Sequence, residues 1–197
     1  MKKLFPILFL ILLTGCLQTT VLKNGYSQAP VNPKVFQNKA SFDKSILAQI
    51  DTTVIYEEFL PVYYNGSVQQ QNILARNNHN NRNTTYGVYR FYGNGNYNLF
   101  HLDRNDSVLT QNMFDPAYTG WRGVLYLKKG KITGDLITQT GQLGWQIGKQ
   151  TQEFTAHGDT LYVTAKNRYV YIKRSINPEL LKQHSNWKKA NFPERGL

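Results

Sequence analysis

The side chain with the most distinctive chemistry is the thiol of Cys16, the only cysteine in the 197-residue chain. A positively charged start (MKK), an apolar run over residues 4–13, and the small residues Thr14 and Gly15 precede it. The apolar run is about half the ~20 residues that span a bilayer, which indicates a secretory signal peptide rather than an anchor helix. A single cysteine allows no intramolecular disulfide bond, so the thiol is available for other chemistry.

The sequence Leu13-Thr14-Gly15-Cys16 resembles the lipobox of bacterial lipoproteins, in which an aliphatic residue and two small ones precede the acceptor cysteine. The resemblance implies cleavage between Gly15 and Cys16, a diacylglycerol thioether on the Cys16 sulfur and an acyl chain on its amino group. It further implies a lipid-anchored protein of the bacterial cell envelope. An aspartate after the acceptor would retain such a protein in the inner membrane, so Leu17 favours the outer membrane. The alternative is an ordinary secretory signal that ends near a cysteine.

Other reactive residues do not form a catalytic or metal-binding pattern. Glu57 and Glu58 are adjacent on an expected strand, so their side chains face opposite sides and cannot act as an acid–base pair. The sequence has no Gly-x-Ser-x-Gly motif and no phosphate-binding glycine loop. The four histidines lack metal-site spacing: His79, His101, His157 and His184. We therefore expect neither an enzyme nor a bound metal or other cofactor beyond the acyl chains.

The composition indicates a β-rich, basic domain. Aromatic residues make up 13% of the chain and charged residues only 18%, a balance that favours strands over disorder. The formal net charge of +11 would attract the domain to anionic lipid headgroups or acidic glycans. No stretch gathers five cations, so a dispersed, solvated charge is the alternative. Nucleic acid is not an expected partner, because an outward-tethered lipoprotein does not meet it.

The order of patterns along the chain predicts one folded domain behind a tether. We interpret residues 1–15 as the signal peptide, 16–38 as an acylated tether, 39–187 as a single β-rich domain and 188–197 as a frayed tail. Short helices are expected at Ser41–Ile50 and Glu179–Trp187. Eight strands are expected at residues 52–60, 85–92, 96–103, 121–127, 131–139, 143–154, 160–165 and 168–174.

The expected strands are joined mostly by short turns, which predicts an antiparallel meander. Several strands carry aromatic residues on both faces, as the strands of a small barrel or a two-layer sandwich would. The 51–56 strand, the hairpin around Gly93-Asn94-Gly95 and the closing pair at 158–161 and 170–173 resemble small envelope lipoproteins of unknown role with a lipocalin-like body. The resemblance implies an eight-stranded barrel with short terminal helices.

Aromatic side chains along these strands could line a binding cavity or fill the core. Arg90 interrupts an otherwise apolar strand, so we expect it at a barrel mouth, holding an anionic group, or in solvent. The candidate ligand-facing residues are Arg90, Tyr89, Tyr97, Trp121, Trp145 and Tyr171. The first hypothesis is a protein that binds a hydrophobic or amphiphilic small molecule. The second is a structural envelope protein with a filled core that docks another envelope protein. An interior cavity of several hundred Å³ would favour the first.

Overall fold

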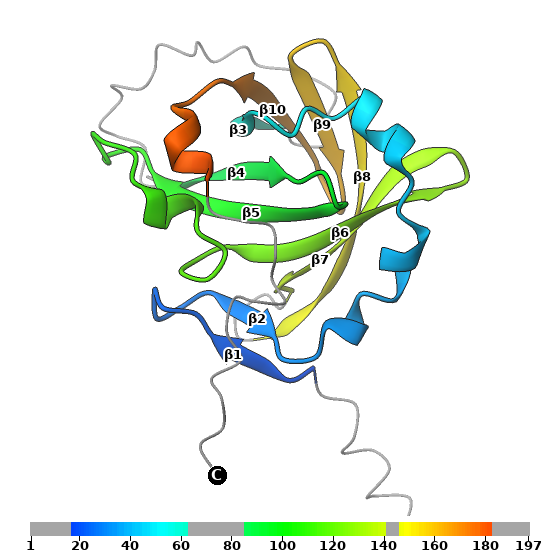
Figure 1. Ribbon diagram of the computed structural model, residues 1–197, viewed down its shortest axis with the longest axis horizontal. Helices are drawn as coiled ribbons and strands as arrows, with labels where there is room; N and C mark the ends of the chain where they lie inside the picture. Colours follow the sequence, from blue (N-terminus) through cyan, green and yellow to red (C-terminus); the bar gives the residue numbers. More distant parts are fainter. Residues whose placement is uncertain (1–16, 63–84, 141–145, 183–197) are drawn as a thin grey trace, which may run out of the picture.

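The computed structural model describes residues 17–62, 85–140 and 146–182. Eight antiparallel strands close into a barrel in the order β10-β3-β4-β5-β6-β7-β8-β9 (Figure 1). The prediction of a mainly β protein with an eight-stranded meander is confirmed, and the closure is a barrel rather than a sandwich. The barrel strands are β3 (Ile55–Val62), β4 (Thr85–Phe91), β5 (Asn96–Asp103), β6 (Trp121–Lys128), β7 (Lys131–Gln139), β8 (Ile147–His157), β9 (Thr160–Thr164) and β10 (Arg168–Arg174).

The first barrel strand begins three residues later than predicted. The Oδ1 atom of Asp51 accepts hydrogen bonds from the backbone N of Thr53 at 2.9 Å and from its Oγ1 at 2.7 Å. These bonds form a local turn that competes with extended backbone. The strand also continues through Pro61, which was expected to end it. Pro61 lies beyond the last β3–β4 pair, where strand β10 is the partner.

The terminal helices are shorter than predicted. The N-terminal one is the 3-10 turn η4 (Lys44–Ala48), and its cap is Asp43, since Asp43 Oδ1 accepts a 2.8 Å bond from Ser45 N. The C-terminal one is the 3-10 turn η7 (Pro178–Leu181), capped by Asn177. Residues 183–187 of the predicted helix lie outside the described residues.

The segment expected to be a tether is packed against the barrel from Leu17 onward. Strands β1 (Thr19–Val21) and β2 (Gln28–Pro30) form an antiparallel pair. Phe36, beyond this pair, is 4% exposed and packs on Val124 and Ile137, which lie on the outer face of β6 and β7. Burial of this apolar surface explains why a segment without strand or helix periodicity is ordered.

The chain then follows the outer wall and closes one end of the barrel. Asn38 donates to Asp135 on β7 at 2.8 Å. Next, the Phe42 ring lies over Gly95, where a Cβ atom would come within 2.4 Å of it. Ile46 and Ile50 complete the closure, since both are buried in the same cluster as the barrel interior. The segment around Ile46 and Ile50 therefore covers the barrel end in place of the predicted N-terminal helix.

Aromatic rings fill the barrel interior. Tyr89 lies at the centre, with its ring centroid 4.8 Å from that of Tyr171 and 5.7 Å from that of Phe154. Phe91 and Tyr97 also contact Phe154, at 5.5 and 5.4 Å between centroids. Edge-to-face pairs of this kind add to the stabilisation from buried area. The interior around these rings is therefore a packed core and not an open cavity.

A second apolar cluster lies outside the barrel wall formed by β3, β4 and β5. Val88 and Phe100 are fully buried there beneath Phe114 of the 3-10 turn η6 (Gln111–Phe114). Turn η7 covers the same wall through Leu180 and Leu181. The strands are therefore buried on both faces, which accounts for the aromatic residues on both sides of their sequences.

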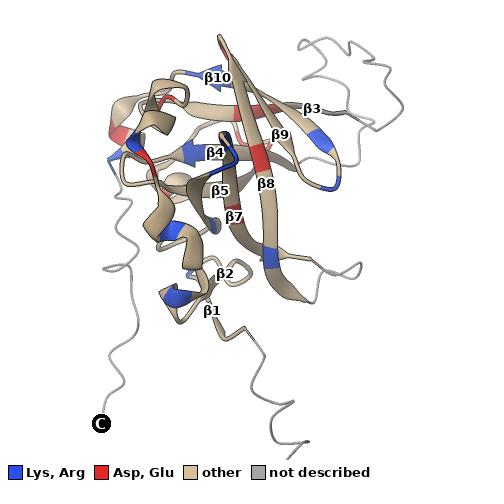
Figure 2. Ribbon diagram, turned by 90° about the vertical axis from the view of Figure 1, so that its right-hand side faces the viewer, with Lys and Arg blue, Asp and Glu red and all other residues tan. Residues whose placement is uncertain are grey.

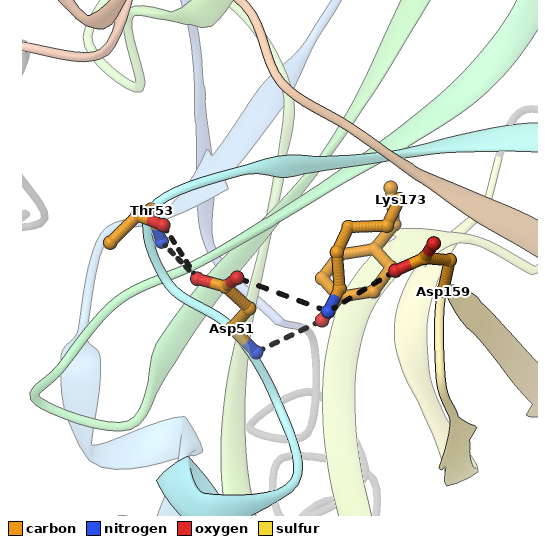
Figure 3. A network of polar contacts seen from close by, with 5 residues as sticks. Asp51, Thr53, Asp159 and Lys173 are labelled. Carbon is orange, nitrogen blue, oxygen red and sulfur yellow. Dashed lines mark hydrogen bonds and ion pairs between the residues drawn. The ribbon is translucent and has the colours of Figure 1, made fainter.

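Charged residues join the elements at the closed end. Figure 3 shows the Lys173 ammonium between the carboxylates of Asp51 and Asp159, at 3.9 and 3.7 Å. The backbone N of Asp51 also donates to the Tyr56 hydroxyl at 2.9 Å. The hydrogen bonds from Thr53 are the main reason that the pKa of Asp51 is lowered, with a smaller contribution from Lys173. The contacts connect β3, β10 and the β8–β9 turn, and their partial exposure limits the stabilisation that they provide.

Candidate functional site

A pocket of about 350 Å³ opens where strands β3 and β4 separate. Three inward-facing residues of neighbouring strands form its wall: Glu58 of β3, Gly87 of β4 and His101 of β5. Thr85 and Tyr86 contribute from the start of β4, and Tyr26 contributes from the β1–β2 turn. The volume is near the lower end of the range for small-molecule sites, ~300–1,000 Å³.

The register of the strands produces the pocket. The β3–β4 ladder pairs Tyr56 with Tyr89 and Glu57 with Val88, and then ends. At the next position the backbone N of Gly87 donates to the Glu58 side chain, Oε2, at 2.6 Å instead of to backbone. A carboxylate thus replaces a backbone acceptor at the point where the sheet opens.

Because Gly87 has no side chain, a space remains between the Glu58 carboxylate and the His101 imidazole. Gly87 pairs directly with His101 across the β4–β5 ladder, while Glu58 lies on its other side. A Cβ atom on Gly87 would lie 3.1 Å from the Tyr171 hydroxyl and 3.2 Å from Glu58 Oε2. A larger side chain would therefore fill the gap between the carboxylate and the imidazole.

Two groups at the pocket have pKa values that favour their neutral forms. His101 is exposed on the pocket side, but the surrounding protein disfavours the imidazolium and lowers its pKa below 6.5. Burial also raises the pKa of the Tyr171 hydroxyl, with smaller contributions from Tyr89 and Glu58, so it stays neutral. Among the six lining residues, Glu58 is the one acidic side chain.

The stability of the barrel should reflect the lowered pKa of His101. Because the unfolded chain binds the proton more tightly, the free energy of unfolding should fall as the pH drops from 6.5 towards the folded-state pKa. We expect His101→Gln to reduce this fall. Urea titrations of both proteins at about pH 7.5 and about pH 5 would measure it. Equal pH dependence in the two proteins would contradict the assignment.

The predicted ligand-facing aromatic residues lie in the core instead of lining the pocket. Tyr89, Tyr97, Trp121 and Tyr171 are at most 5% exposed. None of them is among the six lining residues, although the Tyr171 hydroxyl approaches Gly87. Tyr89 donates to Gln152 Oε1 at 2.9 Å, which satisfies its hydroxyl within the core. Trp145, Gly15 and Cys16 lie outside the described residues.

Arg90 lies neither at a mouth nor in solvent, contrary to its prediction. It is 5% exposed and faces outward from β4, on the face opposite to Tyr89 and Phe91. Its Nη1 donates to the carbonyl of Phe114 at 3.3 Å and its Nη2 donates to the carbonyl of Leu181. The outer face is covered by η6 and η7, so an arginine in an apolar strand is buried between layers.

Sequence analysis alone did not assign Glu58, Gly87 or His101 to a common site. The three residues share no sequence motif, and their common place depends on the pairing of three strands. Strand alternation puts Tyr56 and Glu58 on the same face, and this is the one sequence feature that indicates an inward-facing Glu58. No sequence feature indicates a place for Tyr26, because its segment is expected to be a tether.

The described residues contain neither a cluster of potential metal ligands nor a membrane-spanning helix. Within residues 17–62, 85–140 and 146–182, no three His, Cys, Asp or Glu side chains gather to hold a metal ion. In the same part of the chain, no helix has the length and apolar character needed to cross a membrane. No protein-family model, curated protein or solved structure matches the chain.

Proposed function

We propose that this protein is a non-enzymatic lipoprotein of the bacterial envelope, anchored in the outer membrane through Cys16, that binds a small amphiphilic molecule at the pocket beside Gly87. The observation that carries the binding proposal is the half-buried Glu58 carboxylate in a pocket that His101 and Tyr26 also line. The anchoring proposal is supported by the lipobox-like sequence ending at Cys16.

The chemistry of the pocket favours a ligand with an amine head and an apolar body. The carboxylate of Glu58 accepts hydrogen bonds, and a neutral His101 offers one donor and one acceptor. Charge-assisted hydrogen bonds to a partly buried carboxylate are stronger than neutral ones. Tyr26, which also lines the pocket, provides apolar surface for the body of the ligand. The filled core restricts the ligand to the pocket at the barrel end.

A structural role remains the second candidate, and the filled interior favours it. Tyr89, Phe91, Tyr97 and Phe154 occupy the volume in which a ligand-carrying barrel would hold its cargo. A protein of this type would dock an envelope protein through its surface and bind no small molecule. Ligand titration distinguishes the two candidates.

Replacing Glu58 with Gln should weaken the binding of 2-phenylethylamine by about tenfold, because a charge-assisted hydrogen bond contributes roughly 1.5 kcal/mol or more. Calorimetric titration of the detergent-solubilised protein measures the affinity. The neutral analogue 2-phenylethanol should bind more weakly and show no dependence on this substitution.

Glu57→Gln is the matched control, because Glu57 is the next residue, faces the other side of β3 and contacts Arg174 at 2.7 Å. Binding to the Glu57 variant should equal that to the wild type. If the amine and the alcohol bind equally well, or neither binds, the pocket proposal fails and the structural candidate gains support.

Replacing Cys16 with Ala should remove the acceptor sulfur and therefore the membrane anchor. We expect an unprocessed precursor or a soluble product in cell fractions analysed by immunoblotting. Intact-mass measurement of wild-type protein extracted from membranes should show the mass of the acyl chains. Native electrospray mass spectrometry would reveal a co-purifying ligand. A variant that matures and partitions like the wild type would rule out lipidation.

A further inference from the structure

We propose that the turn between β1 and β2 lies in the headgroup region of the bilayer, so that the pocket at the barrel end opens close to the membrane surface. Residues 21–26, which are the last residue of β1 and most of the turn that follows it, are called the N-terminal turn below. The proposal rests on the proposed acylation of Cys16, and it adds an orientation that anchoring alone does not supply.

From Leu17, the residue that follows Cys16, the chain is packed on the barrel wall. Leu17 is partly buried and packs with Phe36 on Val124 and Ile137 of the barrel wall. Consecutive Cα atoms are about 3.8 Å apart. An acylated Cys16 would therefore hold this wall against the membrane, whereas a free tether of 22 residues would let the barrel stand away from it.

The N-terminal turn exposes apolar side chains a few residues along the chain from Leu17. The described residues include three exposed large hydrophobic side chains, and two of them, Val21 and Tyr26, belong to the N-terminal turn, at 57% and 51% exposure. Lys23 lies between them and is also exposed. An aliphatic side chain, a tyrosine and a lysine are the types that occupy the membrane–water interface.

The segment that contains the N-terminal turn is positively charged. Residues 17–42 contain three lysines and no acidic residue. Lys23 and Lys34 are exposed, while Lys39 donates to Asn96 on β5. Figure 2 shows basic positions on the chain beside β1 and β2, with the acidic ones farther from them. Each lysine near an anionic leaflet contributes about 1 kcal/mol of attraction.

The N-terminal turn is fixed to the barrel and borders the pocket. The backbone N of Asn24 donates to the Tyr118 carbonyl at 3.0 Å, and its side-chain amide donates to Thr119 Oγ1 at 2.8 Å. Tyr26 lines the pocket together with Glu58 and His101. A turn held in the interface thus places the pocket beside the lipid headgroups, and an amphiphile could enter it from the bilayer.

The test uses the fact that Cys16 is the only cysteine, so an acylated chain has no free thiol. Lys23→Cys provides one labelling site on the N-terminal turn for an environment-sensitive nitrobenzoxadiazole dye. Asp159→Cys, 81% exposed on the β8–β9 turn, is the control, because Figure 1 places that turn on the side of the barrel away from β1 and β2. Full-length acylated proteins are reconstituted in vesicles of phosphatidylethanolamine and phosphatidylglycerol.

We expect blue-shifted emission from the dye at position 23, and quenching by nitroxide-labelled lipids several times stronger than for the dye at position 159. Equal, water-like emission and equal quenching at both positions in acylated protein would overturn the orientation while leaving the anchor intact. Intact-mass spectrometry of the same samples shows whether the acyl chains are present. A missing acyl mass, with Cys16 itself reacting with the dye, would overturn the proposed anchoring and with it this inference.

Discussion

Gly123→Ala should lower the free energy of unfolding by about 3 kcal/mol, the upper end of the range for overpacked cores. Gly123 faces the barrel interior, and the Tyr97 ring lies directly against its backbone. A Cβ atom at this position would come within 2.2 Å of Tyr97 Cζ. Tyr97 is fully buried, with Phe91 and Phe154 against it, so the ring cannot move without displacing the rest of the core.

Gly93→Ala is the control for this substitution. Gly93 is exposed in the β4–β5 turn, and a Cβ atom there meets no heavy atom within 4 Å. The reduced entropy of the unfolded chain should leave its stability unchanged or slightly raised. Urea titrations followed by tryptophan fluorescence measure both variants. Similar stabilities for the two alanine variants would mean that the ring does not occupy the space above Gly123.

A double variant tests the cause of the loss. Tyr97→Leu alone leaves a cavity in the core and should also be destabilising. In the combined Gly123→Ala and Tyr97→Leu protein, the added methyl group occupies part of that cavity. The combined loss should therefore be smaller than the sum of the single losses by about 1 kcal/mol or more.

Turn chemistry is the reason that so much of the barrel could be predicted from the sequence. Gly95, Gly130 and Gly158 all adopt positive φ angles, at 77°, 76° and 57°, and each lies in a short connection between neighbouring strands. Glycine tolerates this conformation, and the flanking residues are β-branched or aromatic. Strand number and order follow from such local signals. Closure into a barrel does not, because the β10–β3 pairing joins strands that are far apart in the sequence.

The elements that surround the barrel gave no comparable signal. Leu17 and Phe36 are isolated apolar residues in a polar segment, and their burial depends on the complementary wall at Val124 and Ile137. The pocket has the same character, since Glu58 and His101 come together only through the pairing of β4 with both neighbours. A residue pattern read along one strand cannot show whether a second layer covers its outer face. This explains why the environment of Arg90 was predicted wrongly.

Arg90→Met should lower the free energy of unfolding by about 2–3 kcal/mol, because a buried charged donor that serves two acceptors is lost. The guanidinium donates to the final carbonyls of two separate 3-10 turns, Phe114 of η6 and Leu181 of η7. It therefore holds both covering elements on the β4 strand. Methionine keeps much of the apolar stem of the side chain, so that the loss reports on the guanidinium rather than on a large cavity.

Two opposing effects decide the magnitude. Burial lowers the pKa of Arg90, and its Nε has no hydrogen-bond partner among the residues that the structure describes, so removing the charge recovers some desolvation energy. Against this gain stand two carbonyls left without their donor, at roughly 1–3 kcal/mol each when buried, and the loss of the cation–π contact with Tyr92. The losses exceed the gain, and the net effect is destabilising.

Arg168→Met is the matched control, since Arg168 is exposed on β10 and its guanidinium carbon lies 4.4 Å from the Tyr162 ring centroid. Its loss should change the stability by less than about 0.5 kcal/mol. Arg90→Lys should fall between wild type and the methionine variant, because an ammonium lacks the forked geometry that reaches both carbonyls. Hydrogen exchange should show faster opening of η6 and η7 in the Arg90 variants, with the inner barrel strands less affected. If Arg90→Met is as stable as Arg168→Met, the guanidinium does not hold the two turns on the barrel.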